Sequence, residues 1–189
     1  MKYMLKILRS LWFFTSDIIE TIVIALAIFL LVYILLVQPH RVSGDSMLPN
    51  FENGELILTD KLTYKFTPAK RGEVIVFKAP PDKKKDFIKR IIGLPGETIS
   101  ISDGKVLINK QVLDENYLPP VTQIATGSFL KTGEERQIPA NSYFVMGDNR
   151  SHSFDSREWG FLKREDVVGK AWVIYWPLTR LSPVPSVSY

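Results

Sequence analysis

Residues 98–108 read TISISDGKVLI, and this stretch decides the class of fold. Isoleucine alternates with polar residues up to Ser102, and a period of two is the pattern of a half-buried strand. Asp103 and Gly104 then supply two residues that tolerate the positive φ angles of a tight turn. A second apolar run, residues 105–108, leaves that turn. The stretch therefore predicts a β-hairpin.

Short apolar runs broken by turn residues continue on both sides of this hairpin, and helical periodicity is nearly absent after residue 40. Further strands are expected at residues 55–59, 74–77, 87–92, 143–146 and 171–176. Residues 113–137 are polar and weakly patterned, which predicts an insertion or a long hairpin at a sheet edge. The predicted fold is mainly β, an antiparallel β-sheet domain with coiled or partly closed sheets.

One apolar segment near the N-terminus departs from this pattern. No side chain between residues 22 and 37 is charged, and Glu20 is the only strongly polar side chain from residue 18 to residue 37. A membrane-spanning helix needs about 20 mainly apolar residues. A signal peptide has a shorter apolar core, of about 7–15 residues, and a small-x-small cleavage site, whereas Gln38 and Pro39 follow here. One uncleaved N-terminal transmembrane helix is predicted, rather than a buried core helix, which would show a polar face.

The anchor divides the chain into three parts. We expect a cytoplasmic segment at residues 1–16, a transmembrane anchor at residues 17–37 and an extracytoplasmic domain at residues 38–189. Asp17 and Glu20 have the spacing of a helix N-cap and its partner three residues on, and they mark the expected start of the helix.

The orientation follows from the charges that flank the anchor. Lys2, Lys6 and Arg9 precede it, and only Arg41 follows closely, so the positive-inside rule places the N-terminus in the cytoplasm. Residues 1–14 mix these charges with large apolar side chains and could lie along the inner membrane surface.

Composition excludes several classes of site. The chain has 189 residues, no cysteine and two histidines, so disulfides, thiol catalysis and a structural zinc site are not expected. The net charge is +4, and the one tight basic run, residues 83–85, is flanked by Asp82 and Asp86. We interpret this run as a solvated turn tip, with contact to anionic lipid as the alternative. Nucleic acid is not an expected partner, because no aromatic residues are interleaved with the basic ones.

Ser46 and Lys89 are the candidate catalytic residues. A serine hydroxyl is a poor nucleophile until a base removes its proton, and a lysine amine can be that base if burial lowers its pKa. Strand alternation places Lys89 on one face with Phe87 and Ile91, so the amine would be desolvated. Ser46 follows Gly44, where the missing side chain lets a substrate backbone approach.

A charged segment, residues 147–160, is the third candidate. It carries Asp148, Arg150, Asp155 and Arg157 at alternating positions after a strand. The interleaved arginines indicate an ion-pair scaffold rather than a metal site.

Together these segments resemble type I signal peptidases of the single-anchor kind, the membrane-bound serine proteases of the Ser/Lys class. Three blocks carry the resemblance in order: residues 46–49, then residues 71–77 with 89–97, then residues 147–150 with 153–157. The resemblance implies an enzyme, a serine endopeptidase that needs no cofactor. It would remove signal peptides from exported preproteins through an acyl-enzyme, cutting after a small-x-small motif, typically Ala-x-Ala. Its implied setting is the lipid bilayer of a plasma or thylakoid membrane, as a monomer or beside the translocon.

The resemblance also implies residue roles. Ser46 would be the nucleophile and Lys89 the general base, and Ser153 would orient the lysine amine. Asp155, Arg157, Asp148 and Arg150 would support the site, and Gly44, Met47, Phe87 and Ile88 would bind substrate. The backbone N–H of Ser46 would donate to the oxyanion. Some members have a serine two residues before the nucleophile as a second donor, and here that position is Gly44, so Ser43 or a backbone group would replace it.

Three other classes of protein fit the residues less well. A Ser-His-Asp hydrolase would need His40 or His152, but no G-x-S-x-G elbow is present. Self-cleaving repressors use a related Ser/Lys fold, but no helix-turn-helix segment accompanies it here. The remaining alternative is a catalytically inactive membrane-anchored paralogue that acts as a binding module, against which the joint presence of Ser46, Lys89 and Ser153 speaks.

Overall fold

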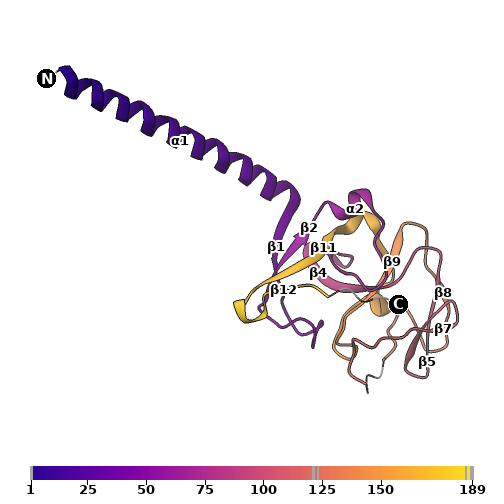
Figure 1. The fold of residues 1–189 in the computed structure, drawn as a ribbon. Coiled ribbons are helices and arrows are strands. Elements are labelled where there is room, and N and C mark those ends of the chain that lie inside the picture. Colours follow the sequence, from indigo (N-terminus) through magenta and orange to yellow (C-terminus); the bar gives the residue numbers. More distant parts are fainter. Residues whose placement is uncertain (1, 121, 123, 186, 188–189) are drawn as a thin grey trace. The chain divides into compact units, whose positions relative to one another are not determined.

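The computed structural model describes the chain apart from residues 1, 121, 123, 186, 188 and 189. The chain divides into two units, Met1–Val37 and Gln38–Tyr189. The first unit is a single helix, and the second carries the two sheets (Figure 1).

The helix of the first unit is α1, Lys2–Leu36. It contains an apolar stretch of 25 residues, Trp12–Leu36, and none of that stretch is buried inside the protein. At 1.5 Å per residue the stretch measures about 38 Å, against about 30 Å for the hydrocarbon core of a bilayer. The helix is therefore long and apolar enough to anchor the chain in a membrane.

The helix does not begin at Asp17, so the prediction that Asp17 and Glu20 mark its start is wrong. Residues 2–16 contain neither glycine nor proline and are rich in leucine, lysine and arginine, which favour helix. The hydroxyls of Thr15 and Ser16 donate to backbone carbonyls one turn earlier, at 2.9 and 2.8 Å. These hydroxyls, which could cap the start of a helix, thus form their hydrogen bonds within the longer helix instead.

The second unit contains two antiparallel sheets. The larger has the strand order β1-β2-β11-β3-β4-β9-β10, with β12 paired to β11, and the smaller has the order β7-β6-β5-β8. The strands of the larger sheet are β1 (Val37–Arg41), β2 (Leu56–Asp60), β3 (Val74–Ala79), β4 (Asp82–Gly93), β9 (Ser142–Met146), β10 (Leu162–Lys163), β11 (Val167–Trp176) and β12 (Ser182–Pro183). Those of the smaller sheet are β5 (Thr98–Ser102), β6 (Lys105–Ile108), β7 (Gln111–Val112) and β8 (Arg136–Gln137).

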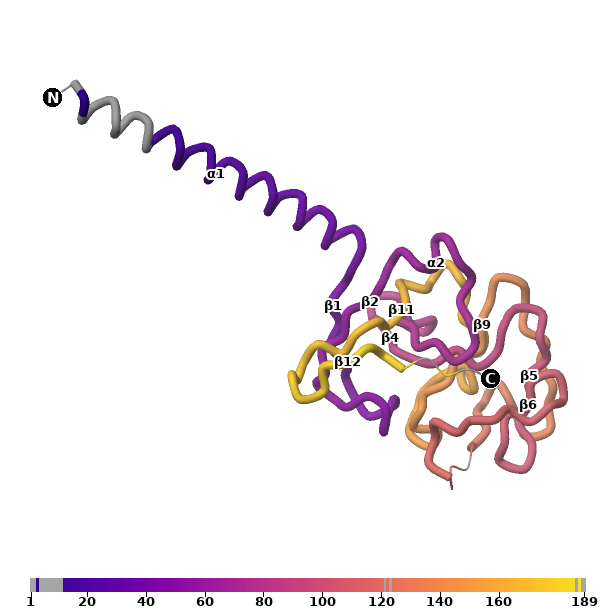
Figure 2. Tube along the Cα trace, in the orientation of Figure 1, coloured from indigo at the N-terminus to yellow at the C-terminus, as the bar shows by residue number. Residues whose placement is uncertain are grey.

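Four short helical segments complete the described domain. They are α2 (Thr63–Phe66), α3 (Ser156–Trp159), and the 3-10 turns η1 (Arg164–Asp166) and η2 (Leu178–Arg180). Each predicted strand overlaps an observed one, and the mainly antiparallel β class is confirmed. Figure 2 shows the smaller sheet on the side of the domain away from β1, β2 and β12.

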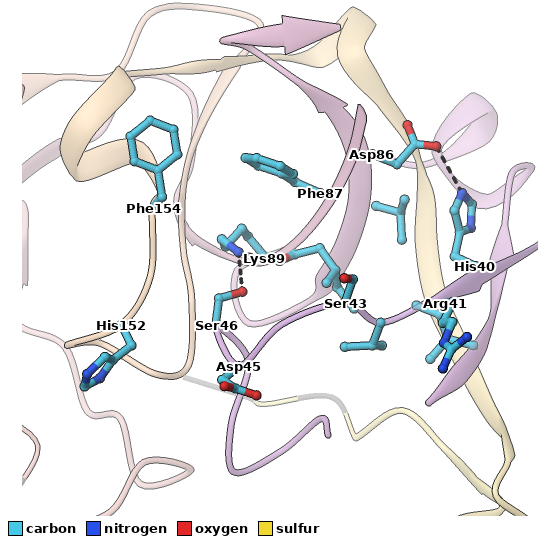
Figure 3. Close-up of a pocket in the computed structure, with 14 residues that line it drawn as sticks. His40, Arg41, Ser43, Asp45, Ser46, Asp86, Phe87, Lys89, His152 and Phe154 are labelled. Carbon is cyan, nitrogen blue, oxygen red and sulfur yellow. Dashed lines mark hydrogen bonds and ion pairs between the residues drawn. The ribbon is translucent and has the colours of Figure 1, made fainter. Parts of the chain in front are cut away.

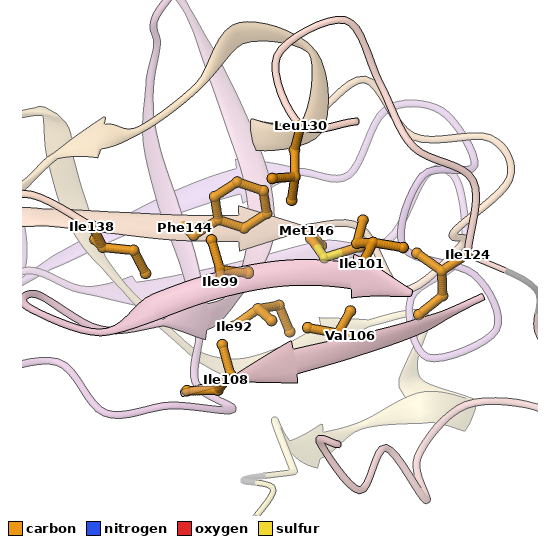
Figure 4. Close-up of a cluster of buried hydrophobic side chains, with 10 residues drawn as sticks. All are labelled: Ile92, Ile99, Ile101, Val106, Ile108, Ile124, Leu130, Ile138, Phe144 and Met146. Carbon is orange, nitrogen blue, oxygen red and sulfur yellow. The ribbon is translucent and has the colours of Figure 1, made fainter. Parts of the chain in front are cut away.

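The predicted hairpin is β5 and β6, and its register pairs Ser102 with Lys105. Asp103 and Gly104 have φ angles of +50° and +69°, as the tight turn requires. The alternating apolar side chains of these strands enter one buried cluster: Ile92, Ile99, Ile101, Val106, Ile108, Ile124, Leu130, Ile138, Phe144 and Met146 (Figure 4). Burial of one face of the hairpin is what fixes its register.

The segment predicted as an edge insertion, residues 113–137, leaves one edge of the smaller sheet and returns to the other. It begins after β7 and ends at β8, the two outer strands of that sheet. Between them the described residues are irregular, and Ile124 and Leu130 cover the apolar cluster. The segment is therefore packed onto the domain.

The larger sheet coils strongly without closing. β1 and β4 are not neighbours in the strand order, yet Nε2 of His40 on β1 lies 3.5 Å from Oδ2 of Asp86 on β4. Inside the coil lies a second apolar cluster that includes Met47, Phe51 and Ile57. The predicted antiparallel β domain is confirmed, and its sheets are unclosed, which fits the coiled alternative of the prediction.

Candidate active site

Ser46 lies on a turn that follows β1. Gly44 in this segment has a φ angle of +85°, and its N–H donates to Oδ1 of Asn53 at 3.0 Å. Met47 and Phe51 are fully buried, and the Phe51 N–H donates to the Met47 carbonyl at 2.9 Å. These buried side chains and hydrogen bonds hold the turn against the core, and Ser46 remains half-buried at the surface of the turn.

Lys89 on β4 reaches this turn. Its Nζ atom lies 2.6 Å from Oγ of Ser46 and 3.0 Å from the carbonyl oxygen of Ile88 (Figure 3). The same atom lies 5.6 Å from the centre of the Phe87 ring. The fold thus brings together the two residues that the sequence singled out, 43 positions apart.

The surroundings of Lys89 favour its neutral form. The residue is 4% exposed and makes no ion pair among the described residues. Burial is the largest influence and lowers the pKa of Lys89 to about 8. The carboxylates of Asp155 and Asp148 oppose this effect, and the Arg157 guanidinium adds to it.

Three buried ion pairs hold the segment that faces this pair, residues 147–157. Each joins a guanidinium to a carboxylate: Arg90 with Asp148, Arg150 with Glu115, and Arg157 with Asp155. The four scaffold residues expected from the sequence are all among them. Two partners, Arg90 and Glu115, were missed, because they lie 58 and 35 positions from the residues that they bind.

Asp155 organises the centre of this segment. Its oxygens accept from Nε and Nη2 of Arg157, both at 2.8 Å, and Oδ2 also accepts from the Gly147 N–H at 3.0 Å. Its Oδ1 caps α3 by accepting from the Arg157 N–H at 3.2 Å. Nη1 of Arg157 donates to the Arg150 carbonyl at 2.7 Å. One carboxylate and one guanidinium therefore tie both ends of the loop together.

The loop also contacts the serine turn directly. The Asn149 N–H donates to the Ser46 carbonyl at 3.1 Å, and Nδ2 of Asn149 donates to the Asp45 carbonyl at 3.0 Å. A Cβ added to Gly147 would lie 2.4 Å from the Ser46 carbonyl oxygen and 2.3 Å from Oγ of Ser153. The close approach of the two segments therefore requires glycine at this position.

Ser153 lies beside the serine turn, but its hydroxyl makes no hydrogen bond to any described residue. Its Oγ atom is buried and has no partner in the described structure. The acceptors within reach of Lys89 Nζ are Ser46 Oγ and the Ile88 carbonyl, and the contact with Ser153 implied by the resemblance is not formed. A buried hydroxyl without a partner is unusual in a folded protein.

A cleft of about 320 Å³ extends from this pair along β4. Its walls include apolar side chains from several strands, and it is lined by His40, Arg41, Val42, Ser43, Asp45, Ser46, Ile57, Val76, Asp86, Phe87, Ile88, Lys89, His152 and Phe154. Phe87 and Ile88 line it as expected. Gly44 is not among the lining residues, and Met47 is buried in the core at 0% exposure. Val42, Ile57 and Val76 were not predicted as lining residues, because their place in the cleft depends on how the sheet coils.

Neither histidine takes the place of a base for Ser46. Nδ1 of His40 lies 2.9 Å from Oγ1 of Thr59, and Nδ1 of His152 lies 2.9 Å from Oγ of Ser151. His152 is exposed at the cleft rim. The described residues also contain no group of three or more side chains placed to hold a metal ion.

The described chain thus presents a serine hydroxyl beside a buried amine, in a cleft of an antiparallel β domain that an apolar helix precedes in the sequence. The family model described as signal peptidase, peptidase S26, matches residues 15–176, and the chain belongs to that family. Signal peptidase I of Leptolyngbya laminosa is 38% identical over 181 residues, which are 90% of this chain and 85% of the relative. Signal peptidase I of Bacillus caldolyticus is 40% identical over 151 residues, 76% of this chain and 81% of the relative.

A solved structure of a signal peptidase I from Enterococcus faecalis V583 is 31% identical, with a TM-score of 0.47, and covers 55% of this chain and 97% of that chain. Membership of the family defines the activity in outline. The chain is a serine endopeptidase that processes signal peptides, its substrates are preproteins, and its apolar helix anchors it in a membrane.

Proposed function

We propose that Ser46 is the nucleophile of this peptidase and Lys89 its general base. The observation that carries the proposal is the 2.6 Å separation of Lys89 Nζ and Ser46 Oγ in a buried site. An amine with a pKa of about 8 is partly neutral at physiological pH and can accept the serine proton.

The proposed reaction proceeds in two halves. Neutral Lys89 takes the hydroxyl proton as Ser46 Oγ attacks the scissile carbonyl. The lysine ammonium returns this proton to the leaving amine when the peptide bond breaks, which leaves the signal peptide esterified to Ser46. Lys89 then deprotonates a water molecule that attacks the ester, and the proton goes back to Ser46 as the acid product leaves. A general base of this kind contributes about 10²–10⁴-fold.

The backbone N–H of Ser46 is the proposed first donor to the oxyanion. Removal of one such donor costs roughly 10²–10³ in rate. Gly44 offers no hydroxyl, and Ser43, which lines the cleft, is the candidate for the second donor. No atom lies within 4 Å of the position that a Cβ on Gly44 would take, so a substrate backbone has room there.

Ser153 and the two ion pairs Arg157–Asp155 and Arg150–Glu115 are proposed to position this apparatus. The two ion pairs hold the loop that supports Ser46, as Asp148 does through Arg90. Ser153 would accept from the lysine amine once substrate engages Ser46.

The proposed substrates carry a small-x-small motif, typically Ala-x-Ala, before the cut. Phe87 and Ile88 narrow the cleft beside Lys89, which suits a small side chain there. Residues 1–16 are proposed to lie in the cytoplasm and residues 38–189 outside, because Lys2, Lys6 and Arg9 outnumber Arg41 around the anchor. The enzyme is proposed to act as a monomer in a plasma or thylakoid membrane, alone or beside the translocon.

The test is cleavage of a preprotein with an Ala-x-Ala site by the full chain in detergent. Ser46→Ala and Lys89→Ala should each lose at least about 10²-fold in rate, while the matched surface variants Ser151→Ala and Lys84→Ala should cleave normally. N-terminal sequencing of the product should place the cut directly after the motif. Full activity of Lys89→Ala would contradict the proposal and assign the base elsewhere.

A further inference from the structure

Tyr117 lies in the segment that runs between the outer strands of the smaller sheet, and it is not among the residues that line the cleft. The residue is half-buried, and Cζ of Arg90 lies over its ring, 4.4 Å from the ring centre. Its hydroxyl accepts from Nη2 of Arg150 at 2.8 Å and donates to Oε1 of Glu115 at 2.8 Å. One side chain of this segment therefore contacts two of the three buried ion pairs.

The Arg90–Asp148 pair is connected to the serine turn by hydrogen bonds. Oδ2 of Asp148 accepts from Nδ2 of Asn50 at 2.8 Å, and Asn50 lies four residues after Ser46. The next residue of the loop, Asn149, donates from its backbone N–H to the Ser46 carbonyl at 3.1 Å. Two neighbouring residues of the loop therefore hold the turn, one at Ser46 and one at Asn50.

The contacts of Tyr117 form a closed circuit. Its ring packs on Arg90, Arg90 binds Asp148, and Asp148 binds Asn50. Nδ2 of Asn50 then approaches the Tyr117 carbonyl oxygen at 3.4 Å, which is a long hydrogen bond. The ring covers the Arg90 guanidinium, which is attracted to an aromatic face, and it keeps water away from an ion pair that water would weaken. Removal of the ring would therefore loosen the whole circuit.

A shift of the Arg90–Asp148 pair would reach both members of the proposed catalytic pair. Arg90 is bonded to Lys89 in β4, and Asp148 is bonded to Asn149, which holds the Ser46 carbonyl. The contact at stake is the 2.6 Å separation of Lys89 Nζ and Ser46 Oγ. A misplacement of about 1 Å between reacting groups can cost about 10²-fold in rate, so small movements of this pair matter.

We infer that Tyr117 is a positioning residue for the catalytic pair, and that its ring acts by holding Arg90 and Asp148 in place. Asn50 transmits this hold to the serine turn. The inference rests on the proposed function of the serine and lysine. The ring of Tyr117 acts on position, whereas its hydroxyl, which lies between two groups that already pair with each other, acts on stability. The segment of residues 113–137 is then part of the catalytic apparatus.

The test measures cleavage of an Ala-x-Ala preprotein by the full chain in detergent, with kcat expressed per folded enzyme, so that a loss of stability does not lower it. In Tyr117→Leu, which lacks the ring, kcat should fall about tenfold while KM changes less than about twofold, because the residue does not line the cleft. Tyr117→Phe keeps the ring, so kcat should stay within about twofold while Tm falls by about 2–4 °C. Phe66→Leu, at an aromatic residue that is 81% exposed, is the control and should change neither.

A double variant tests whether Tyr117 acts through Asn50. Asn50→Ala removes the link from the turn to Asp148 and should also lower kcat about tenfold. Because both changes interrupt one circuit, Tyr117→Leu combined with Asn50→Ala should lose little more than either variant alone. Losses that multiply to about a hundredfold would contradict the shared circuit. Asn116→Ala, at the exposed neighbour of Tyr117, should cleave normally.

The outcomes separate this inference from the proposed function. A wild-type kcat in folded Tyr117→Leu, with Lys89→Ala inactive, would overturn the inference alone. Full activity of Lys89→Ala would overturn the proposed function and the inference with it. Equal losses of kcat in Tyr117→Phe and Tyr117→Leu would contradict the role of the ring. If Tyr117→Leu does not fold, Tyr117→Met, whose flexible side chain can refill the space, supplies the same comparison, and a wild-type kcat there would contradict the inference.

Discussion

Arg90 and Asp148 form a two-point ion pair in the core, with Nε to Oδ1 at 2.8 Å and Nη2 to Oδ2 at 2.6 Å. Their side chains are 1% and 0% exposed. Lys89, the preceding residue of the strand, is also buried but has no carboxylate at ion-pair distance among the described residues. Arg90 thus has a carboxylate partner in the core, whereas burial lowers the pKa of Lys89 to about 8, so the two neighbouring cations differ in role.

The pH dependence of cleavage should report the pKa of Lys89. Because the neutral amine is the active form, kcat/KM should rise about tenfold per pH unit below pH 8 and level off above it. The measurement is a pH-rate profile on a preprotein from pH 6 to 10 with the intact enzyme. A rate that still rises at pH 10, as the ordinary lysine pKa of about 10.4 would produce, or a flat profile, would show that Lys89 is not the base.

Loss of Arg90 should destabilise the domain more than any surface change. Arg90→Met leaves the Asp148 carboxylate buried without its charge partner, which typically costs about 3–5 kcal/mol. Thermal unfolding in detergent should show Tm lowered by roughly 10 °C. The double variant Arg90→Met with Asp148→Asn should recover much of this loss, and the exposed Lys84→Met should show none. An unchanged Tm in the single variant would contradict the structural role of the pair.

Gly147 should tolerate no side chain. The added Cβ of Gly147→Ala would press on the Ser46 carbonyl and the Ser153 hydroxyl at under 2.5 Å, so kcat should fall at least tenfold as the serine turn is displaced. Gly133→Ala is the control, because its φ angle of +73° brings backbone strain but no atom lies within 4 Å. The control should lose stability by about 1–2 kcal/mol and keep its kcat. Equal effects on kcat would argue against close packing as the cause.

Substitution of Ser153 should distinguish a role in orienting the Lys89 amine from a role in the stability of the domain. Its buried hydroxyl makes no hydrogen bond in the described structure, so Ser153→Ala should leave Tm unchanged or raise it slightly. If the hydroxyl accepts from Lys89 during the reaction, kcat should fall about tenfold or more while KM changes little. Cleavage assays with Ser153→Ala and Ser153→Thr would show this split, with Thr restoring part of the rate. A variant with unaltered kcat would remove Ser153 from the site.

Local patterns made part of this structure predictable. The alternation around Ile99 and Ile101, with Asp103 and Gly104 between the runs, specifies a hairpin because period and turn chemistry agree. The start of the membrane helix was not predictable in the same way. Asp17 has the spacing of a helix cap, but the helix begins earlier, at Lys2. The helix-forming residues before Asp17 continue the helix, because their combined propensity outweighs the capping signal.

The sequence by itself determined the β class, the apolar anchor and the two residues on which the chemistry is proposed to depend. Each of these features depends on residues that are close together in the sequence: an alternation of apolar and polar residues, a run of apolar side chains or a short motif. Only the tertiary structure decided that Arg90 and Glu115 complete the ion pairs of the loop, and that His40 meets Asp86 across the cleft. These contacts join residues distant in the chain, and they exist because the larger sheet coils until β1 approaches β4, which no local pattern encodes.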